Sequence, residues 1–148
     1  MSSAENWLLI RTIHSVSILA MLRSVLWKRG PAEPPADGPL VISLTNYHTD
    51  RWRHVPGVWM SGLRLRRAWP AMQGAVGLWL WADPLRRRSG AISVWTNEDD
   101  LGRFVRWPVH VAIMRKYRER GTLEATSWTS ERFEKDDILG EARRRLGS

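Results

Sequence analysis

The sequence MQGAVGLWLWADPLRRRSGAISVWT, residues 72–96, joins two apolar stretches through a polar one. Residues 72–81 and 91–96 are rich in aliphatic residues and tryptophan and alternate in the way that is typical of strands. Residues 83–90 lie between them and supply proline, glycine and several charges, which favour a turn. The stretch therefore predicts a β-hairpin.

The chain on either side of this hairpin predicts further strands and helices. The expected elements are a strand at 40–48, a helix at 51–69 with Pro56 in its first turn, a helix opened by a capping box of Thr96 and Asp99, a helical piece at 109–119 after a break at Pro108, and a strand at 123–129. The order is βαββαβ. It predicts an α+β, ferredoxin-like fold in which an antiparallel sheet carries helices on one face.

Three segments flank this domain, which we expect at residues 40–133. Residues 1–29 predict an amphipathic helix, and residues 30–39 a Pro/Gly-rich linker. Residues 134–148 predict a charged, solvated helix or tail. The longest uncharged run of the first segment, residues 12–22, is shorter than the roughly 20 apolar residues that span a bilayer. This helix therefore either packs against the domain or a partner chain, or lies on a membrane surface.

Composition narrows the class of protein. The 148 residues include ten Trp and no Cys, which excludes disulfides, thiolate metal sites and cysteine nucleophiles and favours a cytoplasmic location. The net charge is +8, and only three of the 23 basic residues are Lys. The Arg clusters could hold phosphates, but no helix-turn-helix, zinc-finger or RNA-recognition pattern accompanies them, which disfavours nucleic acid as a partner.

Strand alternation predicts where the indoles lie. If the aliphatic residues of each strand face the helices, the opposite face carries tryptophans from three strands. So much indole needs a cover, and the simplest cover is a second copy of the same face. The expected helix-facing set is Ile42, Leu44, Val76, Leu78, Leu80, Ile92, Val94, Leu123 and Ala125, and the expected opposite set is Trp79, Trp81, Trp95 and Trp128.

Residues 92–101, ISVWTNEDDL, followed by Phe104, His110 and Met114, resemble a motif of the dimeric α/β-barrel superfamily. The motif is a strand that ends in Trp, an acidic cap, a helix with an aromatic residue, and a His after a short break. Members include the antibiotic-biosynthesis monooxygenases, the heme-degrading monooxygenases and spheroidene monooxygenase. The resemblance covers roughly residues 40–133 and implies a homodimer in which each protomer keeps a small-molecule pocket between sheet and helices.

The resemblance also implies a set of site residues. His110 corresponds to the axial ligand of heme-binding relatives, and Arg106 and Arg115 would meet the propionates. Trp95 corresponds to a pocket aromatic residue, and Asn46 to an amide that holds dioxygen or a substrate oxyanion. Beside these we expect Tyr47 and His48 to be candidates for acid or base chemistry. The candidate pocket lining is Trp59, Trp79, Trp81, Phe104, Trp107, Met114 and Trp128, and the same residues would equally suit a core or a dimer seam.

These observations favour a monooxygenase-like oxidoreductase that acts on a hydrophobic aromatic or polyene molecule of secondary metabolism. Two forms are expected from the resemblance, one that uses heme through His110 and one without a cofactor. Alternatives are a dehydratase or cyclase of the same fold, and a non-catalytic dimeric binding or scaffold protein. No phosphate-binding loop or nucleophile-elbow motif is present in the sequence, which argues against flavin or nicotinamide binding within the chain.

Overall fold

The computed structural model describes residues 26–36 and 38–147. Five strands and four α-helices follow one another, with three short 3-10 turns between them. In chain order they are β1 (Leu26–Arg29), β2 (Leu40–Thr49), η1 (Trp52–His54), α2 (Val55–Ala68), η2 (Trp69–Ala71), β3 (Ala75–Asp83), η3 (Pro84–Arg86), β4 (Arg88–Trp95), α3 (Glu98–Arg106), α4 (Pro108–Tyr117), β5 (Gly121–Ser130) and α5 (Lys135–Gly147).

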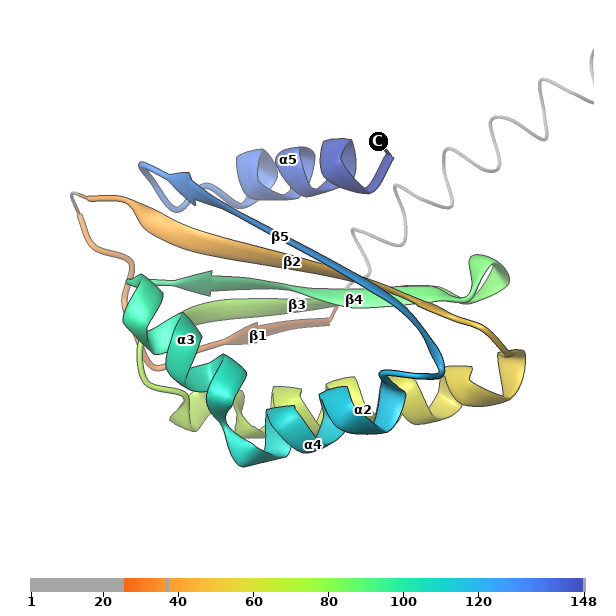
Figure 1. Cartoon of the computed structure of the whole chain (residues 1–148). Helices are drawn as coiled ribbons and strands as arrows, with labels where there is room; N and C mark the ends of the chain where they lie inside the picture. The colour runs from red at the N-terminus through yellow and green to blue at the C-terminus, as the bar shows by residue number, and fades with distance from the viewer. Residues whose placement is uncertain (1–25, 37, 148) are drawn as a thin grey trace, which may run out of the picture.

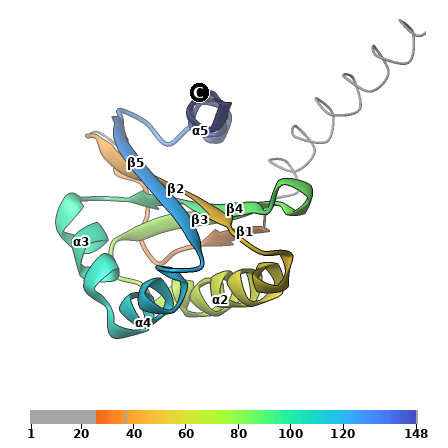
Figure 2. The same cartoon turned by 45° about the vertical axis from the view of Figure 1, so that its right-hand side comes forward.

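The strands form a single antiparallel sheet in the order β1-β3-β4-β2-β5. Helices α2, α3 and α4 lie on one side of this sheet, and α5 lies alone on the other (Figure 1). The view turned by 45° shows the same three layers (Figure 2). Strands β2 to β5 with their helices confirm the predicted ferredoxin-like βαββαβ order, and β1 extends the sheet beside β3.

The break between α3 and α4 follows from the local sequence. Trp107 has an extended backbone, and Pro108 opens α4 at a position where its missing N–H costs nothing. At the start of α3 the predicted capping box is wrong by one residue. The side chain of Asn97, not of Thr96, accepts a hydrogen bond of 2.8 Å from the Asp100 amide and caps the helix.

The N-terminal boundary also differs from the prediction. Residues 26–29, expected as the end of a helix, form β1, and Trp27 pairs with Trp79 across the ladder. The predicted linker begins as an extension of this strand, because Gly30 and Ala32 donate to carbonyls of β3 over 3.0 Å. The rest of the predicted helix, residues 1–25, lies outside the described residues.

Each face of the sheet has its own apolar core. The helix-side core comprises Val41, Trp69, Ala75, Leu78, Leu80 and Trp95, with residues of α2 and α3 packed on it. The α5-side core comprises Leu40, Ile42, Leu44, Val76, Trp79, Trp81, Ile92, Val94, Ile138 and Ala142, with Trp27, Trp128 and Phe133 beside it. The predicted facing is right for Leu78, Leu80, Trp79, Trp81 and Trp128, and wrong for Ile42, Leu44, Val76, Ile92, Val94 and Trp95.

The pairing register explains these reversals. Trp79 pairs with Ile92, and paired residues share a face, so Ile92 joins the tryptophan side and Trp95 the helix side. A register shift between Ala75 and Gly77 likewise moves Val76 to the α5 side. Alternation within a strand shows which residues share a face, but not which face is covered by helices. The assumption that aliphatic residues face the helices fails for β2 and β4.

The cover of the tryptophan face is α5. Ile138 and Ala142 of this helix are fully buried in the α5-side core, so the predicted solvated helix or tail is a packed helix. Cations fasten it to the indoles, because Lys135 Nζ lies 4.3 Å from the Trp27 ring centre and the Arg145 guanidinium 4.5 Å from that of Trp128. The chain itself therefore supplies the cover that we expected from a second copy.

Candidate functional site

Four aromatic rings link β4 to the α3–α4 junction on the helix side of the sheet. The Trp95 ring centre lies 5.4 Å from that of Phe104, which in turn lies 4.6 Å from His110 and 6.4 Å from Trp107. We call these four residues the His110 cluster. The structure thus brings together two of the five predicted catalytic residues, His110 and Trp95, and two predicted pocket residues.

In the described part of the chain, one ring nitrogen of His110 makes a hydrogen bond and the other makes none. Nδ1 lies 3.0 Å from the Val105 carbonyl oxygen, and because a carbonyl only accepts, Nδ1 carries the proton of the neutral ring. Nε2 then keeps its lone pair. Burial lowers the pKa of His110 below 6.5, partly opposed by the bond to Val105. The ring is therefore neutral at neutral pH, with Nε2 available as a base or ligand.

Trp95 is fully buried, and its indole N–H donates to the Ser93 hydroxyl over 2.9 Å. Trp69 packs edge-on against Trp95 and Phe104, with ring centres 5.1 and 5.5 Å apart. The indole nitrogen of Trp69 is also buried, but it has no hydrogen-bond partner among the described residues. An unpaired buried donor is uncommon and needs an explanation. Trp69 is missing from the predicted site because it stood at the end of an expected helix, where nothing in the sequence distinguished it.

The structure does not bring Asn46, Tyr47 and His48 to the His110 cluster. Asn46 shares the α5 face with its neighbour Leu44, and its side-chain oxygen accepts from Arg88 Nε over 3.2 Å. His48 is exposed at the end of β2. Tyr47 faces the helices, but it lies far from Trp95. Val41 is the residue of β2 that pairs with Trp95, and Tyr47 lies six residues further along the strand, a distance of about 20 Å.

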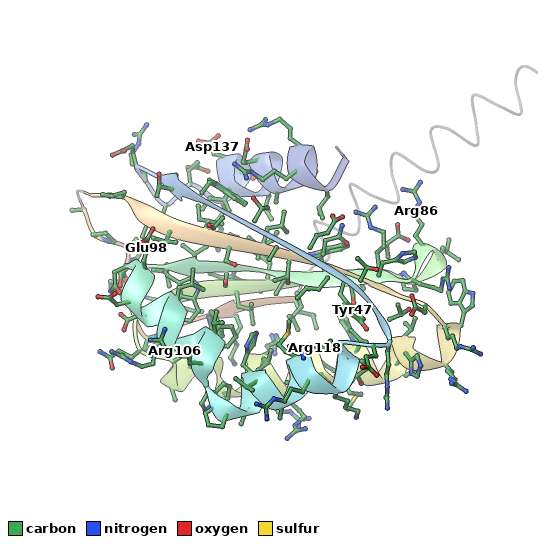
Figure 3. The ribbon with its side chains drawn as sticks, viewed as in Figure 1. Tyr47, Arg86, Glu98, Arg106, Arg118 and Asp137 are labelled. Carbon is green, nitrogen blue, oxygen red and sulfur yellow. The ribbon has the colours of Figure 1, made fainter. Side chains whose placement is uncertain are left out.

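Tyr47 instead makes contacts at the C-terminal end of α4, away from His110. Its hydroxyl donates to the Tyr117 carbonyl over 2.7 Å, and burial, followed by the charge of Asp50, raises its pKa above 10.0. Figure 3 shows Tyr47 near Arg118 at the C-terminal end of α4, while Arg106 lies by the α3–α4 junction. The phenol is therefore a structural donor between β2 and α4.

The remaining predicted residues divide between the two faces. Trp59 packs on the helix-side core, and Met114 is half-buried on α4. Trp79, Trp81 and Trp128 belong to the α5 side, so they do not line a pocket shared with His110. Arg106 and Arg115 are exposed on α3 and α4. Among the described residues, no group of three or more His, Asp or Glu side chains is arranged to hold a metal ion.

A pocket that the sequence analysis did not anticipate lies at the opposite end of α4 from His110. It has a volume of about 440 Å³ and is lined by Asp50, Arg51, Arg53, His54, Glu119 and Arg120. The sequence feature that could have indicated this pocket is the run DRWRH, residues 50–54, in which charged residues and a histidine surround one tryptophan. Only the fold brings this run beside Arg120.

The comparisons with known proteins relate this chain to others by structure alone. No protein-family model matches the sequence, and no protein of curated function matches it. In the described part of the chain, no helix combines the length and apolar character of a membrane-spanning helix.

Solved structures do match. A candidate antibiotic biosynthesis monooxygenase from Deinococcus radiodurans superposes with a TM-score of 0.57 over 64% of this chain and 95% of its own, at 13% identity. The heme-degrading enzyme LmHde from Listeria monocytogenes gives 0.53 over 68% and 67%, at 16% identity. SnoaB, a cofactor-independent oxygenase from Streptomyces nogalater, gives 0.50 over 64% and 96%, at 17% identity.

The share of the neighbouring chain that is matched varies between neighbours. It is 100% for one neighbour and only 50% for another. At these identities the comparison establishes the fold. The chain shares the ferredoxin-like fold of these solved structures, and this confirms the fold that the sequence analysis predicted.

Proposed function

We propose that the protein is a small-molecule oxygenase without a cofactor, which acts on a hydrophobic, electron-rich aromatic or polyene substrate at the His110 cluster. The observation that carries the proposal is the half-buried, neutral imidazole of His110, whose Nδ1–H is held by Val105 and whose Nε2 is free. A neutral imidazole with a fixed tautomer is suited to general-base catalysis.

The chemistry needs no reductant. His110 Nε2 accepts a proton from an activated C–H or O–H of the substrate, and the resulting anion reduces dioxygen. Conversion of a ring CH₂ to a carbonyl consumes one O₂ and releases one water, which balances atoms and electrons. The unpaired indole N–H of Trp69 would stabilise the developing negative charge on a substrate oxygen, since donors placed at such charge lower the barrier most effectively.

The residues around His110 do not fit the heme that the resemblance implied. Neutral Nε2 would suit iron, but the rings beside His110, those of Phe104, Trp95 and Trp69, pack against one another. The guanidinium groups expected to meet the propionates, those of Arg106 and Arg115, are exposed. We therefore assign no step to heme.

We do not propose the predicted homodimer in which two tryptophan faces pack against each other, because α5 covers that face of the sheet. We also propose a cytoplasmic location, which the absence of Cys supports. The membrane-surface role considered for the N-terminal segment falls outside the described residues.

The test is oxygen uptake by the purified protein with a panel of hydroxylated polycyclic aromatic compounds and polyenes. We compare the wild type with His110→Asn, whose amide can retain the donor to Val105 while Nε2 is lost, and with His48→Asn as a matched control at an exposed position. We expect His110→Asn to lower the rate by roughly 10²–10⁴-fold, the contribution of a general base, and His48→Asn to leave it unchanged.

Three results would overturn the proposal. Unchanged uptake in a folded His110→Asn variant would remove the general base. A Soret band on addition of hemin that disappears in the same variant would instead make His110 an iron ligand. Binding of the compounds without oxygen uptake would favour the non-catalytic binding protein, the alternative left open by the sequence.

A further inference from the structure

The pocket at the far end of α4 is distinct from the His110 cluster. We call it the basic pocket; its lining is Asp50, Arg51, Arg53, His54, Glu119 and Arg120. It forms where β2 leads into η1 and where α4 leads into β5. Nine residues separate His110 from Glu119 along α4 and the turn after it, which places the two regions roughly 14 Å apart. The proposed oxygenase chemistry makes no use of it.

Backbone hydrogen bonds hold the walls of the basic pocket together. The Asp50 amide donates to the Arg120 carbonyl over 2.9 Å, and the Arg120 amide donates to the Tyr117 carbonyl over 3.1 Å. The Tyr117 carbonyl also accepts from the buried Tyr47 hydroxyl over 2.7 Å. Within the segment that leads into η1, the His54 amide donates to the Arg51 carbonyl over 3.1 Å. The pocket is therefore formed before any ligand binds, which reduces the ordering cost of binding.

The charges of the pocket favour an anion. Three guanidinium groups and one imidazole face two carboxylates, and within the described residues none of Arg51, Arg53 and Arg120 has a carboxylate oxygen within 4.0 Å. The guanidinium of Arg87 adds a further positive charge where it donates to the Asp50 carbonyl. Burial first, and then the charges of Arg120, Arg53 and Arg51, lower the pKa of His54 below 6.5, partly opposed by the charge of Asp50.

Guanidinium groups that are not engaged with protein carboxylates are well suited to phosphate and carboxylate groups, because the planar fork donates two parallel hydrogen bonds. Arg120 is also held over the Tyr117 ring, at 5.8 Å from its centre, which limits the orientations of its side chain. A volume of about 440 Å³ suits a small molecule. Asp50 and Glu119 would accept hydrogen bonds from hydroxyl or ammonium groups of the same molecule.

We propose that the basic pocket binds a small polar metabolite through an oxyanion, a phosphate or carboxylate group held by Arg51, Arg53 and Arg120. This site is independent of the oxygenase site, so the failure of one proposal does not affect the other.

Isothermal titration calorimetry at constant ionic strength tests the proposal, with inorganic phosphate and succinate as the two probes. We expect saturable binding of one equivalent of at least one probe, and the tighter probe identifies the anion class. Arg120→Gln and Arg53→Gln should each weaken binding about tenfold or more, because each removes a charge-assisted hydrogen bond. Arg64→Gln is the matched control: it removes the same charge from an exposed position on α2 that does not line the pocket.

Two results would overturn the proposal. One is the absence of saturable binding of either probe up to about 10 mM, a concentration at which even a weak specific site is occupied. The other is an equal loss in Arg64→Gln, which would show that net charge alone attracts the anion. Thermal melting of each variant establishes that it is folded. Because the Arg53 side chain is exposed, its variant remains informative if Arg120→Gln does not fold.

Discussion

The two faces of the sheet are both rich in aromatic rings, yet they differ in how their polar atoms are satisfied. On the α5 side the Trp81 indole donates to the Thr45 carbonyl over 3.2 Å, and cations lie over Trp27, Trp81 and Trp128. On the helix side, within residues 26–36 and 38–147, the buried indole N–H of Trp69 has no partner and one ring nitrogen of His110 makes no hydrogen bond. Aromatic content alone therefore does not identify a site. The buried donor of Trp69 and the second ring nitrogen of His110 are the features on which the proposed site rests.

The largest effect should come from removing an indole from the centre of the helix side. Trp95→Ala leaves a cavity between Trp69 and Phe104 and orphans the Ser93 hydroxyl, so we expect a loss of about 3–5 kcal/mol in the free energy of unfolding. Trp128→Ala, on the half-buried edge strand β5, should cost clearly less. Urea denaturation of both variants measures the difference. Equal losses would contradict the assignment of Trp95 to the helix-side core.

The next effect should come from loosening the cover of the other face. Ile138→Ala removes the most buried large side chain of α5, and we expect a loss of about 2–5 kcal/mol, with increased binding of a dye that reports exposed apolar surface. Leu139→Ala, at a half-buried neighbouring position, is the control and should cost less. If Ile138→Ala behaves like the control, α5 is not the cover of the tryptophan face.

A smaller effect is expected at the contact between β1 and β3. Gly77 lies directly against the Trp27 ring, and a Cβ at this position would clash with it. Gly77→Ala should therefore displace Trp27 and cost about 1–3 kcal/mol through overpacking. Quenching of tryptophan fluorescence by acrylamide should rise in this variant. Gly62→Ala is the matched control, since its Cβ would lie in ordinary contact with Leu80 at 3.5 Å.

Local patterns predicted the elements well and their relative placement less well. The hairpin of β3 and β4, the break at Pro108 and the βαββαβ order follow from turn residues, proline and alternation, which act over a few positions. The side on which Ile92 or Trp95 lies depends on the register with β3, and register is set by contacts between distant segments. Strand β1 has only four residues, two apolar and two basic, so its sequence could not be distinguished from the end of a helix.

The candidate site shows the same division. The grouping of Trp95, Phe104 and His110 could be predicted because one short segment of chain, residues 95–110, carries all three residues. Trp69 and the basic pocket could not, because each depends on residues brought together from separate elements. Asn46 illustrates the opposite error, since a residue expected from resemblance lies on the α5 face, bonded to Arg88.

The smallest expected effect is a pH dependence of the free energy of unfolding that comes from His110, on the helix side of the sheet. Burial lowers its pKa in the folded protein below 6.5, so the unfolded chain binds the proton more readily. The folded state is therefore fully stable at neutral pH, and it loses stability as the pH falls through 6.5. The loss levels off below the folded pKa, where both states are protonated. Urea denaturation between about pH 7.5 and pH 5 should show this slope in the wild type and in His48→Asn, and His110→Asn should reduce it. A slope that persists unchanged in His110→Asn would place the responsible group elsewhere, and the neutral, partly buried imidazole on which the helix-side site depends would lose its support.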